Sequence, residues 1–183
     1  MSVSDILNNF INAPANQPYP IHQYAFISPI DIPFTKEVRA ACEANLCGRY
    51  GKSWACPPGA GDWEELRDHY KNYKNALVYT TKHDLEDSFD IEGMDEGRIQ
   101  HEKLDQTVLG LLENEKEPFE LLGAGSCSLC EKCTYPDAPC RFPQKAKRSM
   151  EACGIDVVSL SKSCGINYTN GANTVTYFSV IYF

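Results

Sequence analysis

The sequence lacks any long hydrophobic run, and no apolar stretch approaches the roughly 20 residues that a membrane-spanning helix needs. Basic residues are also missing from the N-terminus, where the first positive side chain is Lys36. A secretory signal would place a charged segment before a short apolar one. We therefore expect a cytoplasmic protein with no membrane partner.

Sequence motifs for organic cofactors are missing as well. There is no glycine-rich loop ending in Gly-Lys-Ser/Thr, which would cradle phosphates, and no Gly-x-Ser-x-Gly nucleophile elbow. The segment Gly123-x-Gly125-x-x-Ser128 lacks the third glycine of a dinucleotide-binding fingerprint. Internal repeats and low-complexity regions are also absent, so we expect one compact globular unit without a nucleotide site.

Positive charge is scarce overall, and the formal net charge of −8 argues against a nucleic-acid-binding protein. Residues 84–120 carry thirteen acids and only three cations, which is typical of a solvated helix face. Cations instead outnumber acids around residues 132–148. Those cations either stabilise the reduced form of a nearby anionic metal cluster or are the wet face of a helix.

Cysteine is abundant by contrast. Nine cysteines in a reducing compartment indicate metal-binding or reactive thiols rather than disulfides. Seven of the cysteines form two motifs. In the second motif along the chain, two residues separate each of three successive cysteines, and a fourth cysteine comes directly before Arg-Phe-Pro143: Cys127, Cys130, Cys133 and Cys140. A chain that curls around a cubane cluster meets a new iron about every third residue, whereas structural zinc sites usually use two separated Cys-x-x-Cys pairs. The second motif therefore predicts a [4Fe-4S] cluster, with zinc as the alternative.

The first cysteine motif comprises Cys42, Cys47 and Cys56, the last followed by Pro57 and Pro58. A cysteine followed by proline is also found where ferredoxin chains leave their cluster, so we expect a second metal site or a contribution to a shared one. Buried structural thiols are the alternative. Cys140 either closes its own cluster or crosses to this first motif.

Seven motif cysteines are one too few for two cubane clusters. The eighth position is open to Cys164, to another ligand such as a histidine, or to water or substrate. Cys153 is expected to be a packed core thiol. None of the four histidines lies at a fixed short spacing from another candidate ligand.

Hydrophobic periodicity predicts a single α/β or α+β domain built on one mixed β-sheet, with flanking helices and two cysteine-rich metal-binding loops. We expect residues 1–30 to form a helix and an extended arm, and residues 31–183 to form the metal-binding domain. Strands are predicted at 24–27, 76–81, 119–122, 155–160 and 173–183, the last in the middle of the sheet because it is apolar on both faces. Helices are predicted at 36–43, 63–70, 95–116 and 144–153.

Two motifs together resemble a known family. The first is Tyr-Gly-x-x-Trp-x-Cys-Pro-Pro ending at Pro58, and the second is Gly-x-x-x-Cys-x-x-Cys-x-x-Cys followed by Pro-Cys-Arg-Phe-Pro ending at Pro143. They are similar to domain of unknown function family 2284, described as predicted metal-binding proteins, from about Asp31 to the C-terminus. The resemblance implies a metal-binding, iron-sulfur protein of anaerobic bacteria or archaea, and it implies no particular reaction.

The sequence thus predicts an iron-sulfur protein with one or two [4Fe-4S] clusters that exchanges single electrons with a partner redox enzyme in anaerobic metabolism. An iron-sulfur enzyme with an open iron position is the first alternative. A zinc-stabilised structural or adaptor protein is the second.

Overall fold

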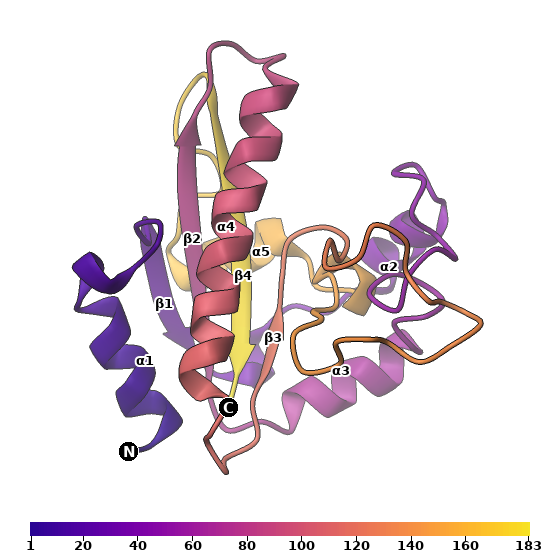
Figure 1. Ribbon diagram of the computed structural model, residues 1–183, viewed down its shortest axis with the longest axis horizontal. Helices are drawn as coiled ribbons and strands as arrows, with labels where there is room; N and C mark the ends of the chain where they lie inside the picture. The colour runs from indigo at the N-terminus through magenta and orange to yellow at the C-terminus, as the bar shows by residue number, and fades with distance from the viewer.

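The computed structural model describes all 183 residues and contains one four-stranded sheet in the order β1-β2-β4-β3. The strands are β1 (Gln23–Ile27), β2 (Ala76–Asp84), β3 (Glu120–Leu122) and β4 (Thr174–Tyr182). All three pairings are antiparallel, so the fold is α+β, and the parallel pairs of a mixed sheet are not formed. β4 lies between β2 and β3, as its two apolar faces predicted (Figure 1).

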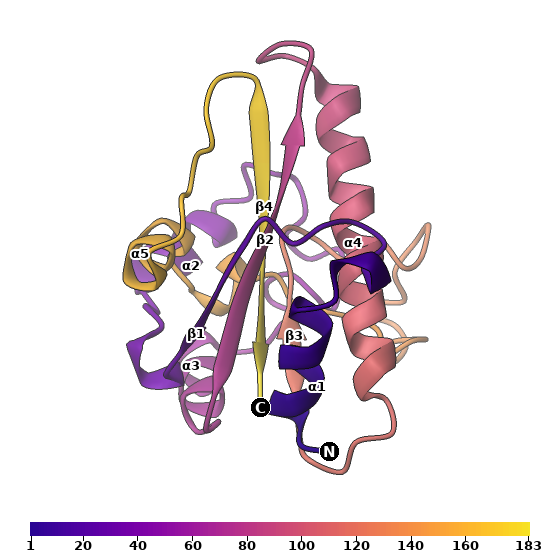
Figure 2. The same cartoon turned by 90° about the vertical axis from the view of Figure 1, so that its left-hand side faces the viewer.

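Five α-helices cover both faces of the sheet (Figure 2). Helices α1 (Val3–Ile11) and α4 (Ile91–Leu112) lie on one face. On the other side lie α2 (Lys36–Glu43), α3 (Trp63–Lys71) and α5 (Val157–Cys164), with a short 3-10 helix, η3 (Glu151–Cys153). Two further 3-10 turns, η1 (Pro14–Asn16) and η2 (Pro29–Asp31), flank β1. None of the helices is long and apolar enough to cross a membrane.

The core has two halves because β2 and β4 alternate apolar residues between the faces. Ala76 and Val78 pack with α3, α5 and η3, whereas Leu77 and Tyr79 pack with α1 and α4. The central part of β2 and β4 is therefore buried on both faces, whereas one face of the edge strand β1 is exposed. The two cysteine motifs lie beside the sheet rather than within it.

Two sequence predictions of local structure are wrong. Residues 144–150 form a turn, an irregular stretch and an isolated bridge at Ser149 instead of a helix, and only η3 is helical before Gly154. Residues 155–160 were expected to be a strand, but α5 begins at Val157, where the Asp156 side chain accepts hydrogen bonds from the backbone N–H and hydroxyl of Ser159. This N-cap and the left-handed Gly165 at the C-terminus are sufficient helix signals, and they outweigh the β-branched start of the segment.

The long helix α4 starts and ends four residues earlier than predicted. Asp90 caps it by accepting a hydrogen bond of 2.8 Å from the Gly93 N–H. Leu104, Val108 and Leu112 are buried as expected, but Leu111 is 43% exposed. The buried face of α4 also contains polar residues, which are described below.

Candidate metal centre

The two cysteine-bearing segments lie side by side at one end of the molecule (Figure 1). The Trp54 Nε1–H donates a hydrogen bond of 3.1 Å to the Ala138 carbonyl oxygen, and the Trp54 ring meets the Tyr135 ring edge-on at 4.8 Å. The Ser149 N–H donates to the Ala55 carbonyl at 3.2 Å. Residues some 80 to 95 positions apart in sequence are thereby joined around the cysteines.

A pocket of about 760 Å³ opens between these segments. It is lined by the three cysteines of the first motif and by two of the second: Cys42, Cys47, Cys56, Cys127 and Cys130. Two arginines and three acids complete its charged lining: Arg49, Arg98, Asp95, Glu131 and Glu151. The fold thus gathers thiols from both motifs around one open space.

A second, much smaller cavity of about 30 Å³ adjoins the pocket. All four cysteines of the second motif line it, together with apolar residues that include Trp54, Leu129 and Phe142. Cys140 therefore lies with its own motif and does not line the pocket of the first motif. Cys127 and Cys130 border both spaces.

No three His, Cys, Asp or Glu side chains are grouped closely enough to hold a metal ion. Ligation therefore requires the cysteine segments to rearrange. Cys47 is the one exposed cysteine and lies in the turn after α2. The thiol-rich donor set itself fits soft or borderline metals such as iron in clusters or zinc.

Two thiols of the first motif, Cys42 and Cys56, have raised pKa values. Burial, together with the neighbouring Cys56 and Cys47, raises the pKa of Cys42 to about 11. Burial also raises the pKa of Cys56, although a hydrogen bond with Ser53 opposes the shift. These thiols hold their protons at neutral pH, so a metal must displace the protons when it binds. Metal affinity should therefore weaken as pH falls.

Arg39 fixes the helix that carries Cys42. Arg39 is only 5% exposed, and its guanidinium donates to the Gly61 carbonyl at 2.8 Å, to the Ala152 carbonyl at 2.9 Å and, through Nε, to Glu43 at 2.7 Å. α2 is therefore attached both to the loop after Cys56 and to η3. Sequence reasoning missed this arginine, because the short amphipathic pattern of α2 does not reveal its partners.

A buried ion-pair network anchors the chain that follows the second motif. The Lys147 ammonium group, 8% exposed, donates to Glu102 at 2.5 Å and to the fully buried Asp105. Asp105 also accepts hydrogen bonds from the Tyr79 hydroxyl at 2.6 Å and the Ser179 hydroxyl at 2.9 Å. The prediction that the acids of this region all lie on a wet helix face is wrong for Asp105.

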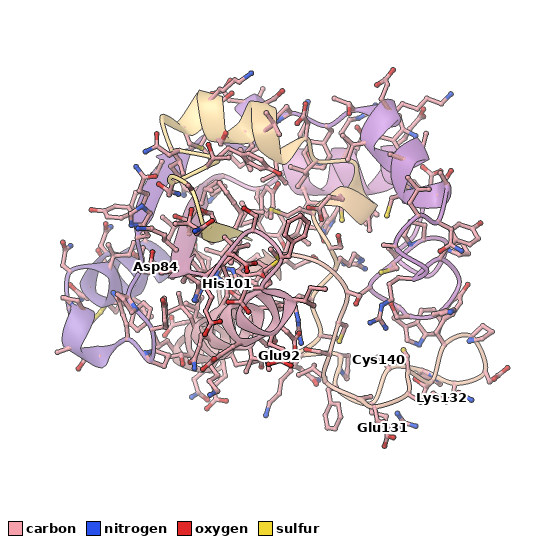
Figure 3. The ribbon with its side chains drawn as sticks, turned by 90° about the horizontal axis from the view of Figure 1, so that it is seen from above. Asp84, Glu92, His101, Glu131, Lys132 and Cys140 are labelled. Carbon is pink, nitrogen blue, oxygen red and sulfur yellow. The ribbon has the colours of Figure 1, made fainter.

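The four histidines line neither cysteine cavity. His101 is buried, with hydrogen bonds of 2.8 Å to both Thr81 and Ser179, and His83 contacts Thr81 at 2.9 Å. Figure 3 shows His101 within the body and Cys140 on the loop at its edge. His22 contacts Asn170, and His69 contacts Glu120. The structure therefore offers no histidine beside the cysteines.

Cys153 and Cys164 also lie outside both cavities. Cys153 is fully buried among core residues on the α3 side, as predicted, and burial raises its pKa to about 12. Cys164 is partly buried at the end of α5 and packs against the same half of the core. The alternative that Cys164 completes a cluster loses its support.

Comparison with protein families gives a match over most of the chain. A family described as "Predicted metal-binding protein (DUF2284)" matches residues 25–183, which include every cysteine. The chain belongs to this family. Searches among curated proteins and among solved structures give no match. The DUF2284 family is described as metal-binding by prediction, and its description names no metal.

Proposed function

We propose that this DUF2284 protein binds a [4Fe-4S] cluster through Cys127, Cys130, Cys133 and Cys140 and transfers single electrons to or from a partner redox protein. The observation that carries the proposal is that all four thiols line one small cavity with an apolar wall. Such a wall limits access of water to the cluster and thereby influences its reduction potential.

Iron-sulfur ligation accounts for the spacing better than zinc does. Three thiols at a constant three-residue interval follow the corners of a cubane, whereas a single zinc ion needs four ligands at tetrahedral positions. The cavity of about 30 Å³ has room for little more than a water molecule, so cluster binding must push the 127–140 loop outward. Helices and strands are absent from this loop, which makes such a movement inexpensive.

A second cluster is assigned to the first motif, Cys42, Cys47 and Cys56. Because Cys127 and Cys130 border both cavities, the two clusters would be neighbours. Neighbouring clusters suit one-electron transfer through the protein toward a surface where a partner docks. The exposed Lys132, Arg141 and Lys145 beside the second motif suit a partner with an acidic docking surface.

An iron-sulfur enzyme with an open iron is the second candidate. The observation that favours it is the large pocket beside a motif with only three cysteines, which leaves room for a small substrate. Zinc in a structural or adaptor protein remains the outcome if no sulfide is present.

The carrier function is tested by reducing anaerobically purified protein stepwise and recording its paramagnetic resonance spectrum. We expect a reversible one-electron signal that Cys133→Ser abolishes or alters for one cluster, while Cys164→Ser leaves it unchanged. Candidate small molecules are then added to the reduced protein. A shifted signal would support the enzyme over the carrier, and the absence of any reducible signal would contradict both.

A further inference from the structure

We propose that the carboxylate of Glu151 is the fourth protein ligand at the metal site formed by Cys42, Cys47 and Cys56. This inference rests on the proposed function, because it assumes that the first motif holds a cluster. It assigns the position that the seven motif cysteines leave without a thiolate.

The other candidates for this position lie elsewhere. Cys164 packs against the core at the end of α5, and no histidine lines the pocket. Only three carboxylates line it: Asp95, Glu131 and Glu151. Asp95 is paired with Arg98 at 2.8 Å, and Glu131 is exposed on the loop of the second motif (Figure 3).

Glu151 is held between the two segments that carry Cys42 and Cys56. On one side, the Ser149 N–H donates to the Ala55 carbonyl, directly before Cys56. On the other side, Arg39, one helical turn before Cys42, donates to the carbonyl of Ala152. Both anchors lie within two residues of Glu151, so the backbone at Glu151 is held to both cysteine-bearing segments.

The charges agree with this geometry. Glu151 lines the same pocket as Cys42, Cys47 and Cys56. Thiolates and a carboxylate that share one site repel one another, and a metal cation held between them would offset that repulsion.

Glu151 retains a free ligating atom. Its Oε2 accepts a hydrogen bond of 2.6 Å from the Ser149 hydroxyl, and Oε1 has no hydrogen-bond partner. The Ser149 contact orients the carboxylate in the way that outer-shell partners orient metal ligands. Carboxylate oxygen is a harder ligand than thiolate, so the iron it holds would be the most exchangeable one, facing the 760 Å³ pocket.

The test compares Glu151→Gln with Glu131→Gln, which alters another carboxyl of the same pocket. Glutamine preserves size and an oxygen that accepts from Ser149, so a purely structural role of Glu151 would survive this change. We expect Glu151→Gln to lose about one iron per chain and to show the resonance signal of a three-iron cluster. Glu131→Gln should match the wild type, and a Glu151→Gln protein with wild-type iron, sulfide and spectrum would overturn the inference.

A second variant, Glu151→Cys, keeps the test decisive if the glutamine variant does not fold. A thiolate at this position should retain all the iron and change the spectrum and midpoint potential of one cluster, because the ligand has changed. A spectrum identical to that of the wild type would overturn the inference. Wild-type protein with a single cluster that survives Cys56→Ser would overturn it too, yet leave the proposed function intact, whereas wild-type protein without sulfide would refute the proposed function itself.

Discussion

Replacing Lys147 by methionine should destabilise the protein strongly, although Lys147 lies outside both cysteine motifs. Its ammonium group is paired with Asp105, which is fully buried, and with Glu102. Methionine fills the same space but leaves both carboxylates without their cation. Breaking a buried ion pair in this way costs about 3–5 kcal/mol, which is a large part of the roughly 5–15 kcal/mol that stabilises a typical domain.

Urea unfolding of the same anaerobically prepared samples measures this loss. With a slope of about 2 kcal/mol per molar urea, the midpoint should fall by about 1.5–2.5 M. Lys145→Met is the matched control, because Lys145 is exposed two residues earlier and its replacement should change stability by less than about 0.5 kcal/mol. A loss below about 1 kcal/mol for Lys147→Met would refute the assignment of this network as the anchor of the chain after the second motif.

Three further predictions address other parts of the structure. Gly59→Ala should cost about 1–3 kcal/mol of stability and lower metal content, since the new Cβ would lie 2.5 Å from the Ser53 carbonyl oxygen and 2.8 Å from the Tyr135 ring. The control Gly110→Ala, whose Cβ would have nothing within 4 Å, should stabilise α4 by about 0.5–1 kcal/mol. If unfolding experiments gave the two variants the same change in free energy, this account would be contradicted. Burial lowers the pKa of His83 to about 4, so the unfolded chain binds more protons than the folded one from about pH 6.5 downward. The free energy of unfolding should therefore fall toward pH 4 by up to about 1.4 kcal/mol per pH unit for this residue. In urea unfolding at several pH values, the free energy of unfolding of His83→Gln should depend less on pH than that of the wild type, and an equal pH dependence would be evidence against the prediction. Cys153→Ser should cost about 1–3 kcal/mol by burying a hydroxyl without a partner but leave metal content unchanged; a loss of metal on analysis would instead make Cys153 a ligand.

The arrangement of the sheet could be predicted to the extent that hydrophobic patterns record it. The apolar run of β4 identified an interior strand, and Thr35 and Asp62 marked the starts of α2 and α3 as side-chain caps. The β-branched residues at the start of α5 favour a strand, whereas the Asp156 side chain caps a helix at the same place. When local sequence signals favour different structures, tertiary packing determines whether the segment becomes a helix or a strand, and the sequence of the segment alone does not contain that information.

The candidate site divides in the same way. Regular spacing identified the four thiols of the second motif as a group, and the structure places them around one cavity. The spacing of the cysteines contains no information on the contact of Arg39 with Ala152, which lies 113 residues later, or on the place of Glu151 in the pocket. The burial of Asp105 could have been predicted from the sequence, because its position one residue after Leu104 and three before Val108 places it on the buried face of α4.

The central claim is that the thiols hold iron-sulfur clusters, and chemical analysis of anaerobically purified protein tests it most directly. Iron, acid-labile sulfide and zinc are counted per chain. The account predicts iron and sulfide in equal amounts, about four of each for one cluster or about eight for two, with little zinc. Colourless protein with stoichiometric zinc and no sulfide would contradict it.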